Sequence, residues 1–237
     1  SVASTSRGRS WSSRATASLR PLIWLDRVET VEARPVEITI PIKSPRELAR
    51  ELAAEAEEKR KPVIEEVGLV MSAHQQEPAW ELDAIVTQIA DVLGGRSPRS
   101  VLLVGPSGAG KTSAIRELIR RRADLSLGAT PFWSTSGSRL VAGMSGFGMW
   151  QERCQRLVRE ASTARAILVL GNLIELTEVG RSTHNAQGIG SFLRPSLSRG
   201  DVLAVCECTP EQLTMLERAD PHLLEVFHII RVDERSE

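Results

Sequence analysis

The sequence predicts an α/β fold in which a parallel β-sheet carries helices on both of its faces. Three observations support this prediction. Short apolar runs typical of buried strands, such as 101–104 and 166–170, alternate with longer segments whose apolar residues recur at helical spacing. Strands that alternate with helices connect through right-handed crossovers, which places them parallel in one sheet. In addition, a glycine-rich segment, 105–110, separates the first of these strands from the helix that follows it.

Length and composition limit the possible classes of protein. A chain of 237 residues can bury one α/β core together with a small appendage. Its 30 basic residues balance its 30 acidic residues, so the net charge favours neither a nucleic-acid partner nor a membrane partner. No apolar run reaches membrane-spanning length and no signal-peptide pattern is present, so a cytoplasmic protein is expected.

The three cysteines are expected to pack in the core. Cys154, Cys206 and Cys208 form no disulfide framework, which suits a reducing compartment. Cys206 and Cys208 lie two apart on a predicted strand and therefore share one face of it. Because no second pair of Cys or His residues lies nearby, core packing is favoured over metal binding.

Residues 1–75 divide by composition into a tail and an extension. Residues 1–20 are rich in serine and arginine and contain no acid, which predicts a flexible, solvated tail. Residues 21–75 are predicted to form an N-terminal extension made of a strand at 36–42 and an amphipathic helix. Ser44 and Glu47 have the spacing of a capping box, so this helix is expected to run from there to about residue 61. Its narrow apolar stripe consists of Leu48, Leu52 and Ala56.

Residues 76–237 are predicted to form the main α/β domain. A helix over 80–93 is expected to bury a row made of Leu82, Ile85, Ile89 and Val92, and the glycines after it end the helix. The helix after the glycine-rich segment presents Ala114, Ile115, Leu118 and Ile119 on one face. Another helix is predicted over 147–162, and further strands over 130–134, 166–170, 201–208 and 227–232.

The segment 105–112, Gly-Pro-Ser-Gly-Ala-Gly-Lys-Thr, matches the phosphate-binding pattern G-x-x-x-x-G-K-[ST] without a mismatch. A strand precedes it and a helix follows, which is the context that the pattern needs. We expect Lys111 to reach the β- and γ-phosphates of ATP or ADP, and the Thr112 hydroxyl to ligate Mg²⁺. The predicted nucleotide-binding residues are Gly105, Pro106, Ser107, Gly108, Ala109, Gly110, Lys111, Thr112 and Ser113.

Over about residues 78–236, the order of elements and several motifs resemble the Clp class of AAA+ ATPases, and in particular their first ATPase module. The segment 138–143, Ser-Arg-Leu-Val-Ala-Gly, is similar to the segment that leads into the family's pore loop, and Glu152-Arg153 fits the helix after it. The segment 192–201 is similar to the family's LLKPALARGE stretch, which precedes the strand of sensor 1. The resemblance implies a P-loop NTPase fold of the AAA+ large-subdomain type, chaperone-like ATPase activity, and other AAA+ subunits or a protein as partners.

The sequence departs from the family where the family's catalytic residues lie. The family's Walker B strand ends in Asp-Glu, whereas the strand at 167–170 is followed by Gly171 and Asn172, neither of which accepts a proton. At most, Asn172 would orient a water through its amide oxygen. The sensor-1 position falls on Cys208, and Thr209, one residue later, is a candidate for the same role.

Further departures concern the subunit interface and the pore. The family's paired arginines fall on Glu225 and Val226, and its pore-loop aromatic residue falls on Gly146, next to Phe147. The family's helical lid would begin after the last predicted strand, so no lid is expected within this chain. Trp80 aligns with the family segment that runs along the adenine, although core packing is the expected role of this side chain.

These losses predict binding without efficient hydrolysis. A general base contributes about 10²–10⁴ to a rate, and an arginine finger about 10³–10⁵. Glu175 and Glu178 are expected to lead away from the γ-phosphate. We therefore predict a module in which nucleotide is a structural or regulatory ligand. Two alternatives remain open: an active ATPase or unfoldase subunit completed in trans by a partner, and an AAA+-fold scaffold or adaptor that scarcely uses nucleotide.

Overall fold

The computed structural model describes residues 44–58, 61–144, 148–181 and 187–233. The chain divides into two units, residues 1–50 and residues 51–237, and each is considered by itself. The predicted tail at 1–20 and the predicted strand at 36–42 lie outside the described residues.

Helix α1 covers Pro45–Glu58, a little less than the predicted extent. Its capping box is confirmed, because the Ser44 amide donates to Glu47 Oε2 over 2.7 Å and the Glu47 amide donates to Ser44 Oγ over 3.2 Å. The backbone hydrogen bond from Ser44 lowers the pKa of the Glu47 carboxyl. Leu48 and Leu52, on the predicted apolar stripe, are exposed.

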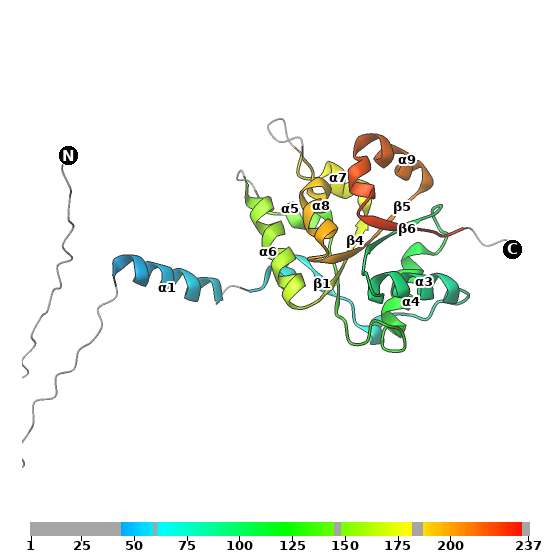
Figure 1. Cartoon of the computed structure of the whole chain (residues 1–237), viewed down its shortest axis with the longest axis horizontal. Coiled ribbons are helices and arrows are strands. Elements are labelled where there is room, and N and C mark those ends of the chain that lie inside the picture. The colour runs from blue at the N-terminus through cyan, green and yellow to red at the C-terminus, as the bar shows by residue number, and fades with distance from the viewer. Residues whose placement is uncertain (1–43, 59–60, 145–147, 182–186, 234–237) are drawn as a thin grey trace, which may run out of the picture. The chain divides into compact units, whose positions relative to one another are not determined.

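A six-stranded sheet organises the second unit, in the order β1-β3-β4-β5-β2-β6 (Figure 1). The pairs β3–β4, β4–β5, β5–β2 and β2–β6 are parallel, which confirms the predicted parallel sheet, whereas β1 is antiparallel to β3. The sequence analysis missed β1, since two residues are too few to show an alternating pattern. The strands are β1 Leu69–Val70, β2 Ser100–Val104, β3 Phe132–Ser134, β4 Ile167–Asn172, β5 Leu203–Cys208 and β6 Phe227–Arg231.

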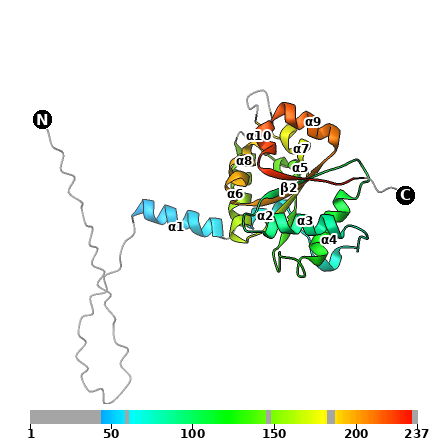
Figure 2. The same ribbon diagram turned by 45° about the vertical axis from the view of Figure 1, so that its right-hand side comes forward.

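Helices cover both faces of this sheet, as predicted (Figure 2). On one face, α3 (Asp83–Gly94) and α4 (Lys111–Arg121) pack on one set of strand side chains, among them Leu103 and Val205. The alternate strand side chains, among them Leu102 and Ala204, pack on the opposite face. The helices there are α2 Val63–Val67, α5 Gly137–Val141, α6 Met149–Thr163, α7 Leu173–Glu178, α8 Ile189–Arg199, α9 Pro210–Ala219 and α10 Pro221–Leu224.

The core confirms the apolar face predicted for the helix after the glycine-rich segment. Ala114, Ile115, Leu118 and Ile119 of α4 are all buried. The three cysteines are free and buried, as predicted, and burial raises the pKa of the Cys154 thiol to about 12. Within the described ranges, no cluster of three or more His, Cys, Asp or Glu side chains could hold a metal ion.

The prediction for α3 was partly wrong. The helix begins at Asp83, and its buried residues are Val86, Ile89, Ala90 and Leu93, whereas the predicted Ile85 and Val92 are only partly buried. Apolar residues occupy both of these neighbouring rows, so spacing alone did not distinguish which row faces the sheet.

Trp80 does not pack in the core, contrary to expectation, because the residue is 76% exposed. It precedes the helix, in a segment that is tied to α4 by the Ala79 amide, which donates to Glu117 Oε2 over 3.1 Å. Glu117 is buried and paired with Arg120, and the hydrogen bond from Arg120 lowers the pKa of the Glu117 carboxyl.

Residues 63–71, which the sequence analysis assigned to the N-terminal extension, contribute to the same core as the sheet. Val63, Ile64 and Val67 of α2 are buried, and the Ile64 amide donates to Glu160 of α6 over 2.8 Å. Thr135 Oγ1, just after β3, donates to the Val67 carbonyl over 2.8 Å.

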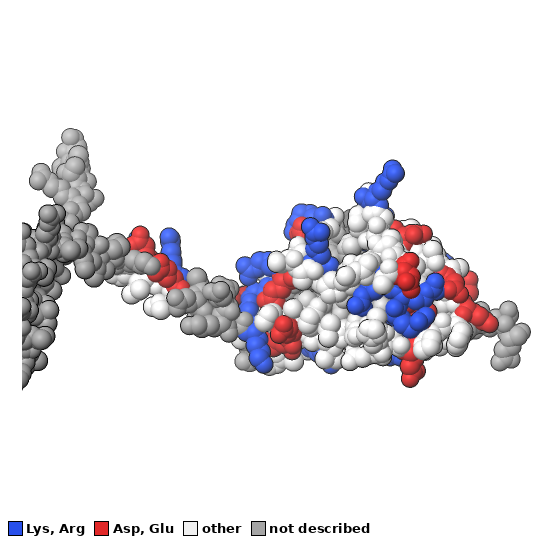
Figure 3. Space-filling view, turned by 90° about the horizontal axis from the view of Figure 1, so that it is seen from below, with Lys and Arg blue, Asp and Glu red and all other residues white. Residues whose placement is uncertain are grey.

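The surface of this unit mixes the two charge signs. On the face shown in Figure 3, basic and acidic side chains lie next to one another. Across the helices that the structure describes, none is both long and apolar enough to cross a membrane.

Candidate nucleotide-binding site

The loop between β2 and α4 has a backbone that demands glycine at particular positions. Gly108 and Gly110 have φ values of +88° and +89°, in the left-handed region that side chains disfavour. A Cβ atom on Gly105 would lie 2.1 Å from the carbonyl oxygen of Val232, just after β6. The glycines therefore set the curvature of the loop and its fit against the neighbouring chain.

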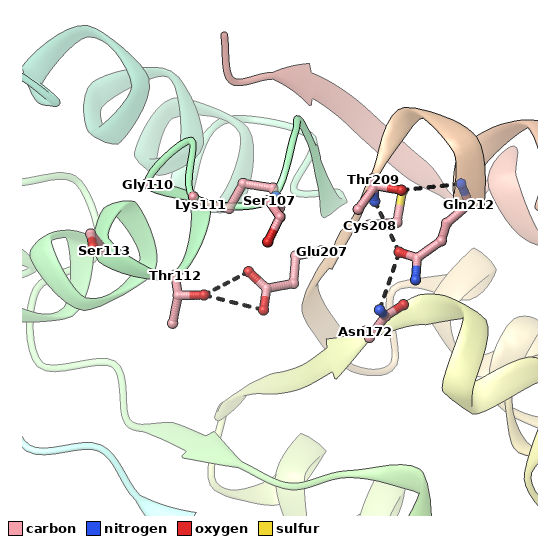
Figure 4. Close-up of a pocket in the computed structure, with 11 residues that line it drawn as sticks. Ser107, Gly110, Lys111, Thr112, Ser113, Asn172, Glu207, Cys208, Thr209 and Gln212 are labelled. Carbon is pink, nitrogen blue, oxygen red and sulfur yellow. Dashed lines mark hydrogen bonds between the residues drawn. The ribbon is translucent and has the colours of Figure 1, made fainter. Parts of the chain in front are cut away.

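The loop borders a pocket of about 330 Å³ where the ends of β4 and β5 meet the N-terminus of α4 (Figure 4). Ligands of open α/β sheets bind at this edge, outside the carboxyl ends of parallel strands. The pocket is lined by Ser107, Gly108, Gly110, Lys111, Thr112, Ser113, Asn172, Glu207, Cys208, Thr209 and Gln212.

Three of the predicted binding residues build the loop instead of lining the pocket. The Gly105 amide donates to the Cys208 carbonyl over 3.2 Å, and the Ala109 amide donates to the Pro106 carbonyl over 3.3 Å. The carbonyls of Gly105 and Pro106 accept hydrogen bonds from Lys111 Nζ, over 2.7 and 2.6 Å. These two hydrogen bonds hold the Lys111 ammonium against the loop, beside the pocket. The residue as a whole is only 9% exposed.

Thr112, in the first turn of α4, contacts an acid that the sequence analysis missed. Its hydroxyl donates to the Glu207 carboxylate, 2.9 Å from Oε2 and 3.2 Å from Oε1. Glu207 lies on β5 and is half-buried. Strand alternation gave part of the signal, since Glu207 faces the side of β5 opposite to Cys206 and Cys208. Only the packing of the sheet shows that this side faces α4.

At the end of β4, the backbone and the side chains serve structural roles. Gly171 has a φ of +68° and follows a register shift between β4 and β5. Asn172 is the N-cap of α7: its Oδ1 accepts from the Ile174 amide over 3.1 Å, and its Nδ2 donates to Gln212 Oε1 over 3.1 Å. Asn172 lines the pocket but carries no carboxylate. Both ends of its side-chain amide are already engaged in these two hydrogen bonds.

At the end of β5, Cys208 and Thr209 also line the pocket. Burial raises the pKa of the Cys208 thiol to about 11, although the Lys111 charge nearby opposes this shift, so the thiol is neutral at pH 7 and only a weak donor. Thr209 is the N-cap of α9 and shares a capping box with Gln212, a pocket residue that the sequence analysis also missed. The spacing Thr-x-x-Gln before an apolar helix was the signal that could have found it.

The other residues considered from the sequence lie away from the pocket. Glu175 accepts hydrogen bonds from the amide of Ser138, over 3.0 Å, and from its hydroxyl. Glu225 contacts His222 on the surface, and Val226 is buried. The predicted pore-loop positions, Gly146 and Phe147, lie outside the described residues.

Comparison with known proteins gives one consistent result. Residues 101–208 match the sequence profile of the ATPase family associated with various cellular activities (AAA). Chaperone protein ClpB 2 of Parasynechococcus marenigrum (strain WH8102) is 31% identical over 166 residues, which cover 67% of this chain and 18% of that protein. Chaperone protein ClpB of Aquifex aeolicus (strain VF5) is 22% identical over 200 residues, or 81% of this chain and 20% of that protein. The chain therefore spans about a fifth of the length of these relatives.

Among solved structures, a similar fold occurs in a complex of Saccharomyces cerevisiae Hsp104 with casein. The TM-score is 0.64 at 23% identity, and the match covers 73% of this chain and 31% of that chain. The Hsp104–ADP complex of the same organism gives a TM-score of 0.62 at 22% identity, with 73% of this chain and 25% of that chain covered. At this identity the likeness concerns the fold, and it agrees with the parallel sheet and its helical layers.

Proposed function

This chain belongs to the AAA+ ATPases and carries a module of the Clp class, and from this premise we propose that it binds ATP or ADP with Mg²⁺ and hydrolyses ATP poorly. In the proposed role, nucleotide is a structural or regulatory ligand of the module. The observation that carries the proposal is a contrast within one pocket. The loop residues Lys111 and Thr112 are present, while the end of β4 consists of Gly171 and Asn172.

Support for binding comes from the chemistry of the loop. Its glycines hold a tight curve at the N-terminus of α4, where backbone N–H groups and the helix dipole favour an anion. The Lys111 ammonium lies beside the pocket and adds a positive charge for the phosphates. The donor set also fits Mg²⁺, which takes oxygen ligands, since the Thr112 hydroxyl borders the pocket at its acidic wall. When bound, Mg²⁺ would neutralise part of the phosphate charge.

Support for poor hydrolysis comes from the opposite wall of the pocket. The Asn172 side chain cannot take a proton from water, and its amide group is engaged by the N-cap of α7 and by Gln212. The neutral Cys208 thiol is a weak donor at the sensor-1 position. Away from this wall, Glu225 and Val226 occupy the positions of the family's paired arginines. A positioned base and an arginine finger normally supply several powers of ten each, so their loss removes most of the rate enhancement.

A ligand in this pocket would act on stability, because the pocket joins α4 to the ends of two strands and the start of α9. A ligand that binds only the folded state stabilises it by about 2.7 kcal/mol at a hundred times its Kd. We therefore propose that nucleotide holds these elements together, either for the module itself or for partners such as other AAA+ subunits or another protein.

The test is equilibrium binding of a fluorescent ATP or ADP analogue, combined with thermal unfolding with and without nucleotide. We expect the wild-type chain to bind and its Tm to rise. Lys111→Ala should weaken binding about a hundredfold, which corresponds to about 2.7 kcal/mol of lost interaction. Lys61→Ala is the matched control, because Lys61 is exposed and does not line the pocket, so this variant should bind like the wild type.

Two outcomes would contradict the proposal. A folded wild-type chain that binds neither ATP nor ADP would favour the scaffold or adaptor function instead. Binding that is equal in Lys111→Ala and in the wild type would show that the loop is not the nucleotide site.

A further inference from the structure

Glu207 is the one acidic side chain in the lining of the pocket, as far as the structure describes it. It lies on β5, the strand between β4 and β2. In register, Glu207 is paired with Asn172 on β4 and with Leu103 on β2. The carboxylate therefore stands one strand away from the β4 end, at the same level of the sheet.

The alternation of β5 directs the Glu207 side chain toward α4. Val205 packs in the core beneath α3 and α4, whereas Cys206 and Cys208 pack on the other face. Glu207 has the same orientation as Val205 and is closer to the carboxyl edge of the sheet. Its two oxygens accept from the Thr112 hydroxyl over 2.9 and 3.2 Å, as Figure 4 shows.

A carboxylate at this place has a definite electrostatic consequence. Nucleotide phosphates in the loop would face a second negative charge across the pocket, which opposes binding unless a cation lies between them. Mg²⁺ suits this arrangement, because it is commonly held by one or two carboxylates, several waters and the phosphates of the substrate. The Thr112 hydroxyl, the expected ligand of Mg²⁺, is already in contact with the Glu207 carboxylate.

From this geometry we infer that Glu207 supports Mg²⁺ in the nucleotide site, in place of an acid at the end of β4; the inference rests on the proposed nucleotide binding. Glu207 and Thr112 would hold the ion together, and the carboxylate would supply the negative charge that the cation needs. The affinity for nucleotide is consequently coupled to Mg²⁺ through a residue of β5. Another role for the same contact is local: Glu207 would only stabilise the first turn of α4, which begins at Lys111.

The test compares nucleotide affinity in excess Mg²⁺ with affinity in EDTA, for the wild type, Glu207→Gln and Glu217→Gln. Glu217 is the matched control, because it is an exposed glutamate on α9 that does not line the pocket. We expect Mg²⁺ to strengthen binding about tenfold or more in the wild type and in Glu217→Gln. In Glu207→Gln this ratio should fall several-fold, since the variant lacks both the repulsion of the carboxylate without Mg²⁺ and its attraction with Mg²⁺, while Thr112 and the phosphates remain.

A second readout observes the metal itself. Mn²⁺ in place of Mg²⁺ gives an electron paramagnetic resonance signal that changes when the ion binds in the presence of ADP. We expect Glu207→Gln to weaken this Mn²⁺ binding about tenfold and Glu217→Gln to leave it unchanged.

The outcomes separate the inference from the function on which it rests. A wild-type Mg²⁺ ratio and wild-type Mn²⁺ binding in Glu207→Gln would overturn the inference while nucleotide binding stands. A lower Tm of Glu207→Gln without nucleotide, with both metal readouts unchanged, would assign Glu207 to the local role in α4 and equally overturn it. If the wild type binds no nucleotide, either with or without Mg²⁺, the proposed function and the inference are both overturned.

Discussion

Two walls of the same pocket differ in the residues they carry: the loop between β2 and α4, and the end of β4. The loop keeps Lys111, Thr112 and the glycines that shape it. The end of β4 offers Gly171 in a left-handed conformation and Asn172 as a helix cap. The two walls depend on different local structure, because the loop leads from β2 into α4, whereas Gly171 and Asn172 end β4 and lead into α7.

The loop wall packs closely against the neighbouring chain at Gly105, so a substitution there is expected to cause the largest change in stability. Gly105→Ala would place a Cβ atom 2.1 Å from the Val232 carbonyl, a backbone atom that cannot move without shifting the end of β6. We expect the variant to lose about 3 kcal/mol of unfolding free energy, the upper part of the range for overpacking. Chemical denaturation, followed by circular dichroism, measures this loss.

Gly171→Ala is the matched substitution on the other wall. No heavy atom lies within 4 Å of its added Cβ, so only the φ of +68° opposes the change. We expect a loss of about 1 kcal/mol. Equal losses at the two glycines would contradict the view that close packing shapes only the loop wall.

An effect of about the same size as that of Gly171→Ala is expected from Asn172. Asn172→Ala removes the N-cap of α7 and the hydrogen bond to Gln212, and the loss of a cap costs about 1 kcal/mol. Asn172→Asp keeps an oxygen that can accept from the Ile174 amide, so it should lose less. The measurement is the unfolding free energy of both variants, and an Asp variant as unstable as the Ala variant would show that the cap is not what Asn172 contributes.

The fold and the structure of the loop wall could be predicted from the sequence, because both follow from local patterns. The apolar strand at 101–104, the glycine-rich segment and the apolar face of α4 predicted their own structure. The prediction of the buried row of α3 was wrong in part, because neighbouring rows of the helix are both apolar and only packing decides which one faces the sheet. The prediction that Trp80 packs in the core was also wrong. In a connecting segment, no periodic pattern shows whether an aromatic side chain faces the core or the solvent.

The opposite wall could be predicted only in part. Gly171, Asn172 and Cys208 were singled out because they stand where the resembling family carries other residues. Glu207 belongs to no motif, and its relevance arises only when β5 is placed beside β2 and its side chain faces Thr112. A contact between residues 95 positions apart depends on sheet order, which alternation along one strand does not reveal.

The central proposal is that this module binds nucleotide and hydrolyses ATP poorly, and single-turnover hydrolysis tests it most directly. Wild-type protein in excess over radiolabelled ATP and Mg²⁺ is followed for product formation, with Lys111→Ala as the control for contaminating ATPases. The account predicts that ATP bound to the wild type is converted much more slowly than about 1 s⁻¹, after subtraction of the rate in the Lys111→Ala sample. Conversion at about 1 s⁻¹ or faster, the lower end of ordinary enzyme turnover, that is abolished by Lys111→Ala would contradict it.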